Sequence, residues 1–176
     1  MSQQTARDQR SVGGLVGALG VLVAVILAWV GLQALKSDPP SSPMRTVAYA
    51  ADVPGARRAA DFDLVAPPRL PAGWRATTVS FTGAPGARWH LGVLTAAQRY
   101  VGLEQGNQPV SSMVRTYVDR AATRGRSLDV AGTPWSTYTD SGGDRALVRR
   151  AGRTTTLVVG HDVPVSELVS YTASLR

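Results

Sequence analysis

Residues 11–35 are 25 consecutive residues without a charged side chain, bounded by Arg10 and Lys36. A helix of this length spans about 37 Å at ~1.5 Å per residue, which is enough to cross a hydrocarbon core of about 30 Å. A cleaved signal peptide has an apolar region of only about 7–15 residues and a small-residue cleavage site close behind it. This run is longer and no good site follows it closely. The sequence therefore predicts an uncleaved transmembrane signal-anchor helix.

The charges that flank the run predict which way it crosses the membrane. The ten-residue tail before it carries Arg7 and Arg10 against Asp8, whereas the other flank carries Lys36 against Asp38. Basic residues prefer the cytoplasmic side of a membrane helix. We therefore expect a single-pass protein of the cell membrane, bound to the bilayer through residues 11–35, with its N-terminus inside and its main domain outside.

Small residues recur four positions apart within the run, at Gly20, Ala24 and Ala28. Such a stripe lets two membrane helices approach closely, and it predicts a homodimer through these residues. The alternative is that glycine and alanine are simply abundant throughout this chain.

Three prolines follow the run within residues 36–44. Proline lacks a backbone donor and resists both helix and central strand, so this segment is expected to be a semi-rigid linker. Residues 45–176 are long enough for one domain with a hydrophobic core. The expected organisation is a cytoplasmic tail over 1–10, an anchor over 11–35, a linker over 36–44 and an extracytoplasmic domain over 45–176.

Short segments with the composition and alternation of β-strands dominate the domain. The clearest is residues 88–94, where Trp89, Leu91 and Val93 alternate with polar or small residues. The expected strands are residues 74–81, 88–94, 100–105, 126–131, 135–139, 145–150 and 153–161.

Two further segments have apolar residues at helical spacing. The first begins after Pro109 and is expected to run toward a stop at Gly125, and the second begins after Pro164. Because no helical crossover separates most consecutive strands, the sequence predicts an α+β domain. We expect an antiparallel sheet of about six or seven strands with both amphipathic helices on one face.

The second and third expected strands form a hairpin that permits a more detailed prediction. If its loop is centred on Ala97, Gly92 lies opposite Gly102, and His90 lies opposite Glu104 on the same face. Facing glycines leave backbone uncovered, which often marks the close approach of a ligand or of another backbone. We therefore take these four residues as candidate binding residues. The alternative is a helix packed over the glycines, with the histidine and the glutamate as an ordinary cross-strand pair.

No pattern of residues predicts catalysis or metal binding. His161 and Asp162 are adjacent, and neighbours in a strand point to opposite faces, so Asp162 is expected to start the following helix instead. Ser136, Ser141 and Ser166 lie in no nucleophile motif. The chain has two histidines and no cysteine, and it lacks a phosphate-binding loop. The sequence therefore predicts no catalytic residue, no metal and no cofactor.

The chain is basic, with a formal net charge of +7. Outside the cytoplasm such a surplus favours anionic envelope lipids or wall polymers over nucleic acid as partners. The alternative is an ordinary solvated surface.

Several segments resemble an actinobacterial family of single-span membrane proteins that is catalogued as a domain of unknown function. The resemblance covers almost the whole chain, and it implies a membrane-anchored architecture without supplying a catalytic residue. The matching segments are LPAGWRAT at 70–77, WHLG at 89–92, YVGLEQ at 100–105, Gly132-x-x-Trp135, ALVR at 146–149 and Glu167-Leu168.

Together these observations predict a non-enzymatic, membrane-anchored extracytoplasmic module that binds an envelope component or a membrane protein. One alternative is an envelope hydrolase that uses His90 with Glu104, which requires a cleft where these groups meet a nucleophile or an activated water. Another is a domain similar to lipid or lipoprotein carriers and sensors, an analogy of fold alone.

Overall fold

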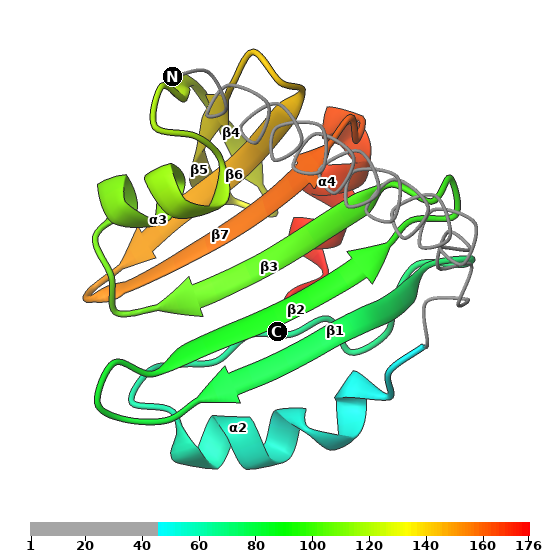
Figure 1. The fold of residues 1–176 in the computed structure, drawn as a ribbon, viewed down its shortest axis with the longest axis vertical. Helices are drawn as coiled ribbons and strands as arrows, with labels where there is room; N and C mark the ends of the chain where they lie inside the picture. Colours follow the sequence, from blue (N-terminus) through cyan, green and yellow to red (C-terminus); the bar gives the residue numbers. More distant parts are fainter. Residues whose placement is uncertain (1–45) are drawn as a thin grey trace, which may run out of the picture. The chain divides into compact units, whose positions relative to one another are not determined.

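Seven strands form one antiparallel sheet, in the order β1-β2-β3-β7-β6-β5-β4 (Figure 1). The computed structural model describes residues 46–176, which include all of these strands. The predicted α+β class and the predicted sheet are confirmed, and every expected strand is present within three residues of its expected bounds. The strands are β1 Arg75–Thr82, β2 Arg88–Leu94, β3 Tyr100–Gly106, β4 Thr123–Val130, β5 Thr133–Thr139, β6 Asp144–Ala151 and β7 Thr154–His161.

The expected tail, anchor and linker over residues 1–44, together with the small-residue stripe at Gly20, Ala24 and Ala28, lie outside the described residues. Within the part of the chain that the structure describes, no helix is long and apolar enough to cross a membrane.

Within residues 46–176, three α-helices and one 3-10 helix accompany the sheet: η1 Tyr49–Ala51, α2 Val53–Ala59, α3 Val110–Tyr117 and α4 Val165–Ala173. The helices after Pro109 and Pro164 begin as predicted, whereas α2 was not predicted. It is only seven residues long and buries just Val53 and Ala56, so its sequence carries little helical periodicity.

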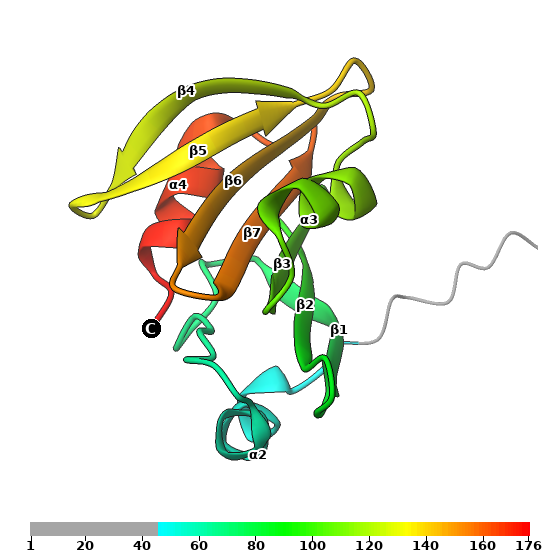
Figure 2. The same cartoon turned by 90° about the vertical axis from the view of Figure 1, so that its left-hand side faces the viewer.

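The prediction that both amphipathic helices cover one face is wrong. α3 packs through Met113 and Val114 against a cluster that includes Val148 of β6, whereas α4 packs through Leu168 against a cluster that includes Leu147. Successive strand residues point to opposite faces, so the two helices cover opposite sides of the sheet (Figure 2). A helical stripe specifies that one side of a helix is buried, but it does not specify which face of a sheet receives it.

The helix α3 ends at Tyr117, earlier than the predicted stop at Gly125. Gly125 instead lies within β4. A Cβ at Gly125 would lie 2.5 Å from Oγ1 of Thr137 on the neighbouring strand β5, so this glycine permits a close strand contact. The Thr137 hydroxyl donates a 2.8 Å hydrogen bond to the carbonyl of Arg126, which ties the two strands together.

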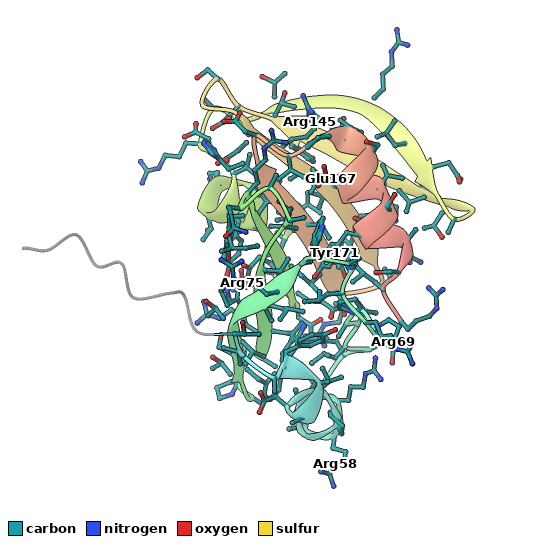
Figure 3. The ribbon with its side chains drawn as sticks, turned by 90° about the vertical axis from the view of Figure 1, so that its right-hand side faces the viewer. Arg58, Arg69, Arg75, Arg145, Glu167 and Tyr171 are labelled. Carbon is teal, nitrogen blue, oxygen red and sulfur yellow. The ribbon has the colours of Figure 1, made fainter. Side chains whose placement is uncertain are left out.

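The main hydrophobic core lies between the sheet and α4. Tyr171 of α4 is fully buried there (Figure 3). Its ring stacks on that of Trp74, with ring centroids 5.5 Å apart. The 3-10 helix and α2 cover the same side through buried Tyr49, Val53 and Ala56. Fully buried strand residues of this core are Trp89, Leu91, Val93, Val101, Leu103, Leu147 and Val158.

Candidate functional site

A cleft of about 440 Å³ lies on the face of the sheet that α3 partly covers. It contains the histidine and the glutamate that the sequence singled out, and it adds hydroxyl groups, an arginine and two tyrosines around them. The lining residues are Ser80 and Thr82 of β1, Arg88 and His90 of β2, Tyr100 and Glu104 of β3, Thr116 and Tyr117 of α3, and Val159 of β7.

The register between β2 and β3 places the histidine and the glutamate opposite each other, as the sequence predicted. In the hairpin of β2 and β3, His90 lies opposite Glu104, and Gly92 lies opposite Gly102. The Thr95 N–H donates to the Arg99 carbonyl and the Arg99 N–H donates to the Thr95 hydroxyl, which closes a loop centred on Ala97 as predicted. Alternation and one turn position therefore sufficed to find both pairs.

His90 and Glu104 are in direct contact, with 2.5 Å between Nδ1 and Oε1. The Glu104 residue is only 5% exposed, whereas the His90 side chain is 24% exposed. A carboxylate accepts hydrogen bonds, so the Nδ1–H group of His90 donates to Oε1 of Glu104. The other ring nitrogen, Nε2, is not used in this contact.

The two glycines are not bare, and neither a helix nor an open backbone patch lies there. The ring of Tyr100 lies across both of them: a Cβ on Gly92 would be 2.9 Å from its Oη, and a Cβ on Gly102 would be 3.3 Å from its Cε1. Glycine thus gives the ring room to lie on the sheet. Tyr100 is 40% exposed, and it is the only large hydrophobic side chain among residues 46–176 that is exposed.

Both phenols of the cleft hold their protons firmly. Burial, followed by the negative charge of Glu104, raises the pKa of Tyr100 to about 12. Burial is also the largest cause that raises the pKa of Tyr117, with a further contribution from Glu104 that Arg88 opposes. At neutral pH both hydroxyls are therefore protonated and able to donate as well as accept hydrogen bonds.

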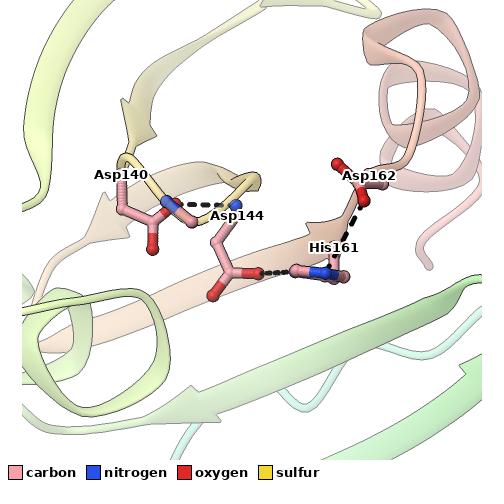
Figure 4. Close-up of polar contacts among 5 residues, drawn as sticks. Asp140, Asp144, His161 and Asp162 are labelled. Carbon is pink, nitrogen blue, oxygen red and sulfur yellow. Dashed lines mark hydrogen bonds and ion pairs between the residues drawn. The ribbon is translucent and has the colours of Figure 1, made fainter.

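The second histidine belongs to a different cluster. Nδ1 of His161 lies 2.9 Å from Oδ1 of Asp144, and its Nε2 lies 3.6 Å from Oδ2 of Asp162 (Figure 4). The hydrogen bond to Asp144 is the main cause that raises the pKa of His161, followed by the charge of Asp162. This cluster is exposed and lies at the end of β7 beside the β5–β6 turn.

The expectations for His161 and Asp162 need correction. Asp162 has a φ of +53° and has left the strand, so its carboxylate reaches the neighbouring ring instead of pointing to the other face. It does not start α4, which begins after Pro164 without a side-chain cap. Leu157, which lies opposite Glu104, comes four residues before His161 on β7. The two histidines are thus separated by about 13 Å along the strand direction and do not share a site.

The sequence did not single out Ser80, although it lies opposite His90 on the neighbouring strand β1. Extending the register argument to the β1–β2 hairpin would have found it. Ser80, His90 and Glu104 thus lie in a row across three strands, but within residues 46–176 no hydrogen bond joins Ser80 to His90. Of the serines that the sequence did consider, Ser136 accepts a hydrogen bond from Arg124.

A second cleft, of about 370 Å³, opens on the α4 side near the β6–β7 turn. Its lining includes Trp135, Arg149 and Thr172, and the Thr172 hydroxyl is buried without a hydrogen-bond partner in the described part of the chain. It has neither an exposed aromatic ring nor a contact between a histidine and a carboxylate, so the cleft with His90 is the better candidate. No three His, Cys, Asp or Glu side chains of the described residues gather in a way that could hold a metal ion.

The fold and the cleft define an α+β domain with one antiparallel sheet, a helix on each face and a polar cleft beside one of the helices. The sequence matches the family described as "Protein of unknown function (DUF4245)" over residues 7–173, and the chain belongs to that family. The predicted membership of a family of unknown function is confirmed, while its restriction to actinobacteria stays a prediction. None of the curated proteins compared matches the sequence.

Proposed function

We propose that this chain is a membrane-tethered, extracytoplasmic binding module that captures an envelope component in the cleft beside α3. The observation that carries the proposal is the exposed Tyr100 ring, which lies on Gly92 and Gly102 beside the contact between half-buried His90 and buried Glu104. Binding sites in proteins are typically concave surfaces with a few fixed polar groups, and this cleft has that character. The tether rests on the uncharged run over residues 11–35 and on its flanking charges.

The orientation of His90 favours binding over catalysis. Its Nδ1 is committed to Glu104, and its Nε2 lies 3.3 Å from the position that a Cβ of Gly92 would occupy, next to the hydroxyl of Tyr100. A serine hydrolase shares the contact between Nδ1 and a carboxylate, but it would need Nε2 to be hydrogen-bonded to the nucleophile. The module is therefore proposed to be non-enzymatic.

A hydrolase is the second candidate, because Ser80, His90 and Glu104 lie in a row across adjacent strands. Labelling of the full chain with a fluorophosphonate probe tests it. We expect no labelling above that of the Ser80→Ala variant. Labelling that both Ser80→Ala and His90→Asn abolish would replace the binding proposal with the hydrolase.

The main test is affinity capture with the tagged full-length chain, extracted from membranes, with bound lipids, glycans and proteins identified. We expect the Gly92→Ala variant to lose the captured component, because the new methyl group displaces the Tyr100 ring. The matched control is Gly83→Ala in the β1–β2 turn, where a Cβ meets nothing within 4 Å. Equal capture by Gly92→Ala, Tyr100→Ala and wild type would show that the cleft is not the binding surface.

The topology has its own test, because the chain contains no cysteine. A single cysteine introduced at Ser141, in the exposed turn between β5 and β6, is expected to react with a membrane-impermeant maleimide on intact cells. A cysteine introduced at Ser2 should stay unlabelled until the cells are opened. The reverse pattern would place the domain in the cytoplasm.

A further inference from the structure

We infer that the ligand of the cleft is an uncharged saccharide chain, with one sugar ring stacked on Tyr100. This inference rests on the proposed function, because it names the chemistry of what the same cleft binds. Three properties of the cleft support it: an aromatic platform, a lining that both donates and accepts hydrogen bonds, and a balanced charge.

The platform is the outer face of the Tyr100 ring. One face of the ring lies against Gly92 and Gly102, and the side chain nevertheless remains 40% exposed. An aromatic face is electron-rich and attracts weakly positive hydrogens. The C–H groups on one side of a pyranose ring supply such hydrogens on a flat, rigid surface. A flat ring held on the sheet by two glycines therefore suits a sugar better than it suits a flexible acyl chain.

The lining matches the hydroxyl groups at the edge of a sugar. The hydroxyls of Ser80, Thr82 and Tyr117 can both donate and accept hydrogen bonds. The Thr116 hydroxyl donates to the carbonyl of Ser112 and can still accept a hydrogen bond. Sugar hydroxyls also donate and accept, so they can pair with each of these groups, whereas a carboxylate group only accepts.

The charges of the cleft disfavour a strongly charged ligand. Apart from His90, the lining carries one positive side chain, Arg88, and one negative side chain, Glu104. The rest of the domain is different, because residues 46–176 contain 15 arginines against 10 aspartates and glutamates. An anionic lipid or polymer would therefore be attracted to the general surface more than to this cleft.

Size is also compatible with this ligand. A cleft of about 440 Å³ lies within the usual range of small-ligand sites, about 300–1,000 Å³. It holds one part of a longer glycan, whose remaining residues would extend into solvent.

The test uses the full-length chain in nanodiscs of zwitterionic lipid, because common maltoside detergents are themselves saccharides. An array of neutral oligosaccharides identifies the preferred glycan, and calorimetry with penta-N-acetylchitopentaose and maltopentaose measures two defined members of the class. We expect Tyr100→Ala to weaken binding about tenfold, the scale of an aromatic contact, while Tyr100→Phe keeps most of the affinity. Binding should be insensitive to salt, because no net charge is neutralised.

Controls separate a lost platform from a lost fold. Thermal melting of both Tyr100 variants shows whether the domain remains folded, and Gly83→Ala, in the neighbouring turn, should bind like wild type. The inference is overturned if no neutral oligosaccharide on the array binds the wild-type chain, or if Tyr100→Ala binds as well as wild type. It is also overturned if the affinity falls steeply with salt, which would indicate an anionic ligand.

The failure of this inference is distinguishable from the failure of the proposed function. If affinity capture yields a lipid or a peptide that Gly92→Ala loses, the cleft is a binding site but the saccharide is wrong. If nothing captured depends on Gly92, both the saccharide and the proposed function fall.

Discussion

Strand β2 contributes Trp89, Leu91 and Val93 to a core from which solvent is fully excluded, while His90 of the same strand lines a cleft on the other face, where Gly92 lies under the Tyr100 ring. The two faces of the sheet differ in the helices that cover them as well as in their residues. The 3-10 helix, α2 and α4 cover the core side, whereas α3 contacts β6 and β7 and leaves the other strands of its face open.

Strand β2 serves stability with one face and the cleft with the other, because successive side chains of a strand alternate between its faces. Changes on the α4 side should therefore alter stability, and changes at the cleft beside α3 should alter binding with smaller effects on stability. Paired variants from the core and from the cleft test this division.

Leu103 and Glu104 are neighbours on β3 that face opposite sides. We expect Leu103→Ala to lower the free energy of unfolding by about 2–5 kcal/mol, because it leaves a cavity in a fully buried cluster. Urea unfolding of the solubilised chain, followed by circular dichroism, measures this loss. A loss below about 1 kcal/mol would mean that the core side is less tightly packed than its burial implies.

Removal of the His90 side chain from the cleft should lower the free energy of unfolding less than Leu103→Ala does. We expect His90→Ala to lower the free energy of unfolding by about 1–3 kcal/mol, because the buried carboxylate of Glu104 loses its partner. The matched control is His161→Ala, which removes an exposed histidine from Asp144 and should change stability little. Equal losses in the two variants would contradict the importance of burial at the cleft.

Two buried tyrosines on the core side differ in their hydrogen bonds. Tyr49 donates a 2.8 Å bond to the carbonyl of Pro67, whereas the Tyr171 hydroxyl has no partner within residues 46–176. We expect Tyr49→Phe to lower the free energy of unfolding by about 0.5–1.5 kcal/mol and Tyr171→Phe to leave it unchanged or to raise it. Thermal melts of the two variants decide this, and destabilisation by Tyr171→Phe would indicate a partner such as a buried water.

The smallest effect concerns His161. Its pKa is raised above 6.5 in the folded chain, so its stabilising contact is fully present below about pH 6.5 and is lost as the pH rises through the folded value. We expect Asp144→Asn to lower this pKa more than Asp162→Asn does, because the hydrogen bond to Asp144 is the largest cause. NMR titration of the imidazole protons measures the pKa of His161 in each variant. A larger decrease in Asp162→Asn than in Asp144→Asn would contradict the hydrogen bond between His161 and Asp144.

Much of the sheet could be predicted because strand signals are local. The register of the β2–β3 hairpin followed from alternation and from one turn, and it located the pairs at His90–Glu104 and Gly92–Gly102. The β1–β2 hairpin carried the same kind of signal, which would have added Ser80 to the site. Segments without periodicity, such as α2, could not be found in this way because tertiary packing alone maintains them.

Four properties of this protein could be predicted from its sequence: the class of fold, the positions of the strands along the chain, the faces of the β2–β3 hairpin and the membership of a family of unknown function. The face of the sheet that each helix covers depends on tertiary packing, because an apolar stripe on a helix does not specify which face of the sheet it packs against. The tertiary structure also decided that Tyr100 lies over the two glycines and that Asp162 turns back toward His161. Both depend on side-chain directions at strand ends, where the alternation that guided the other predictions no longer applies.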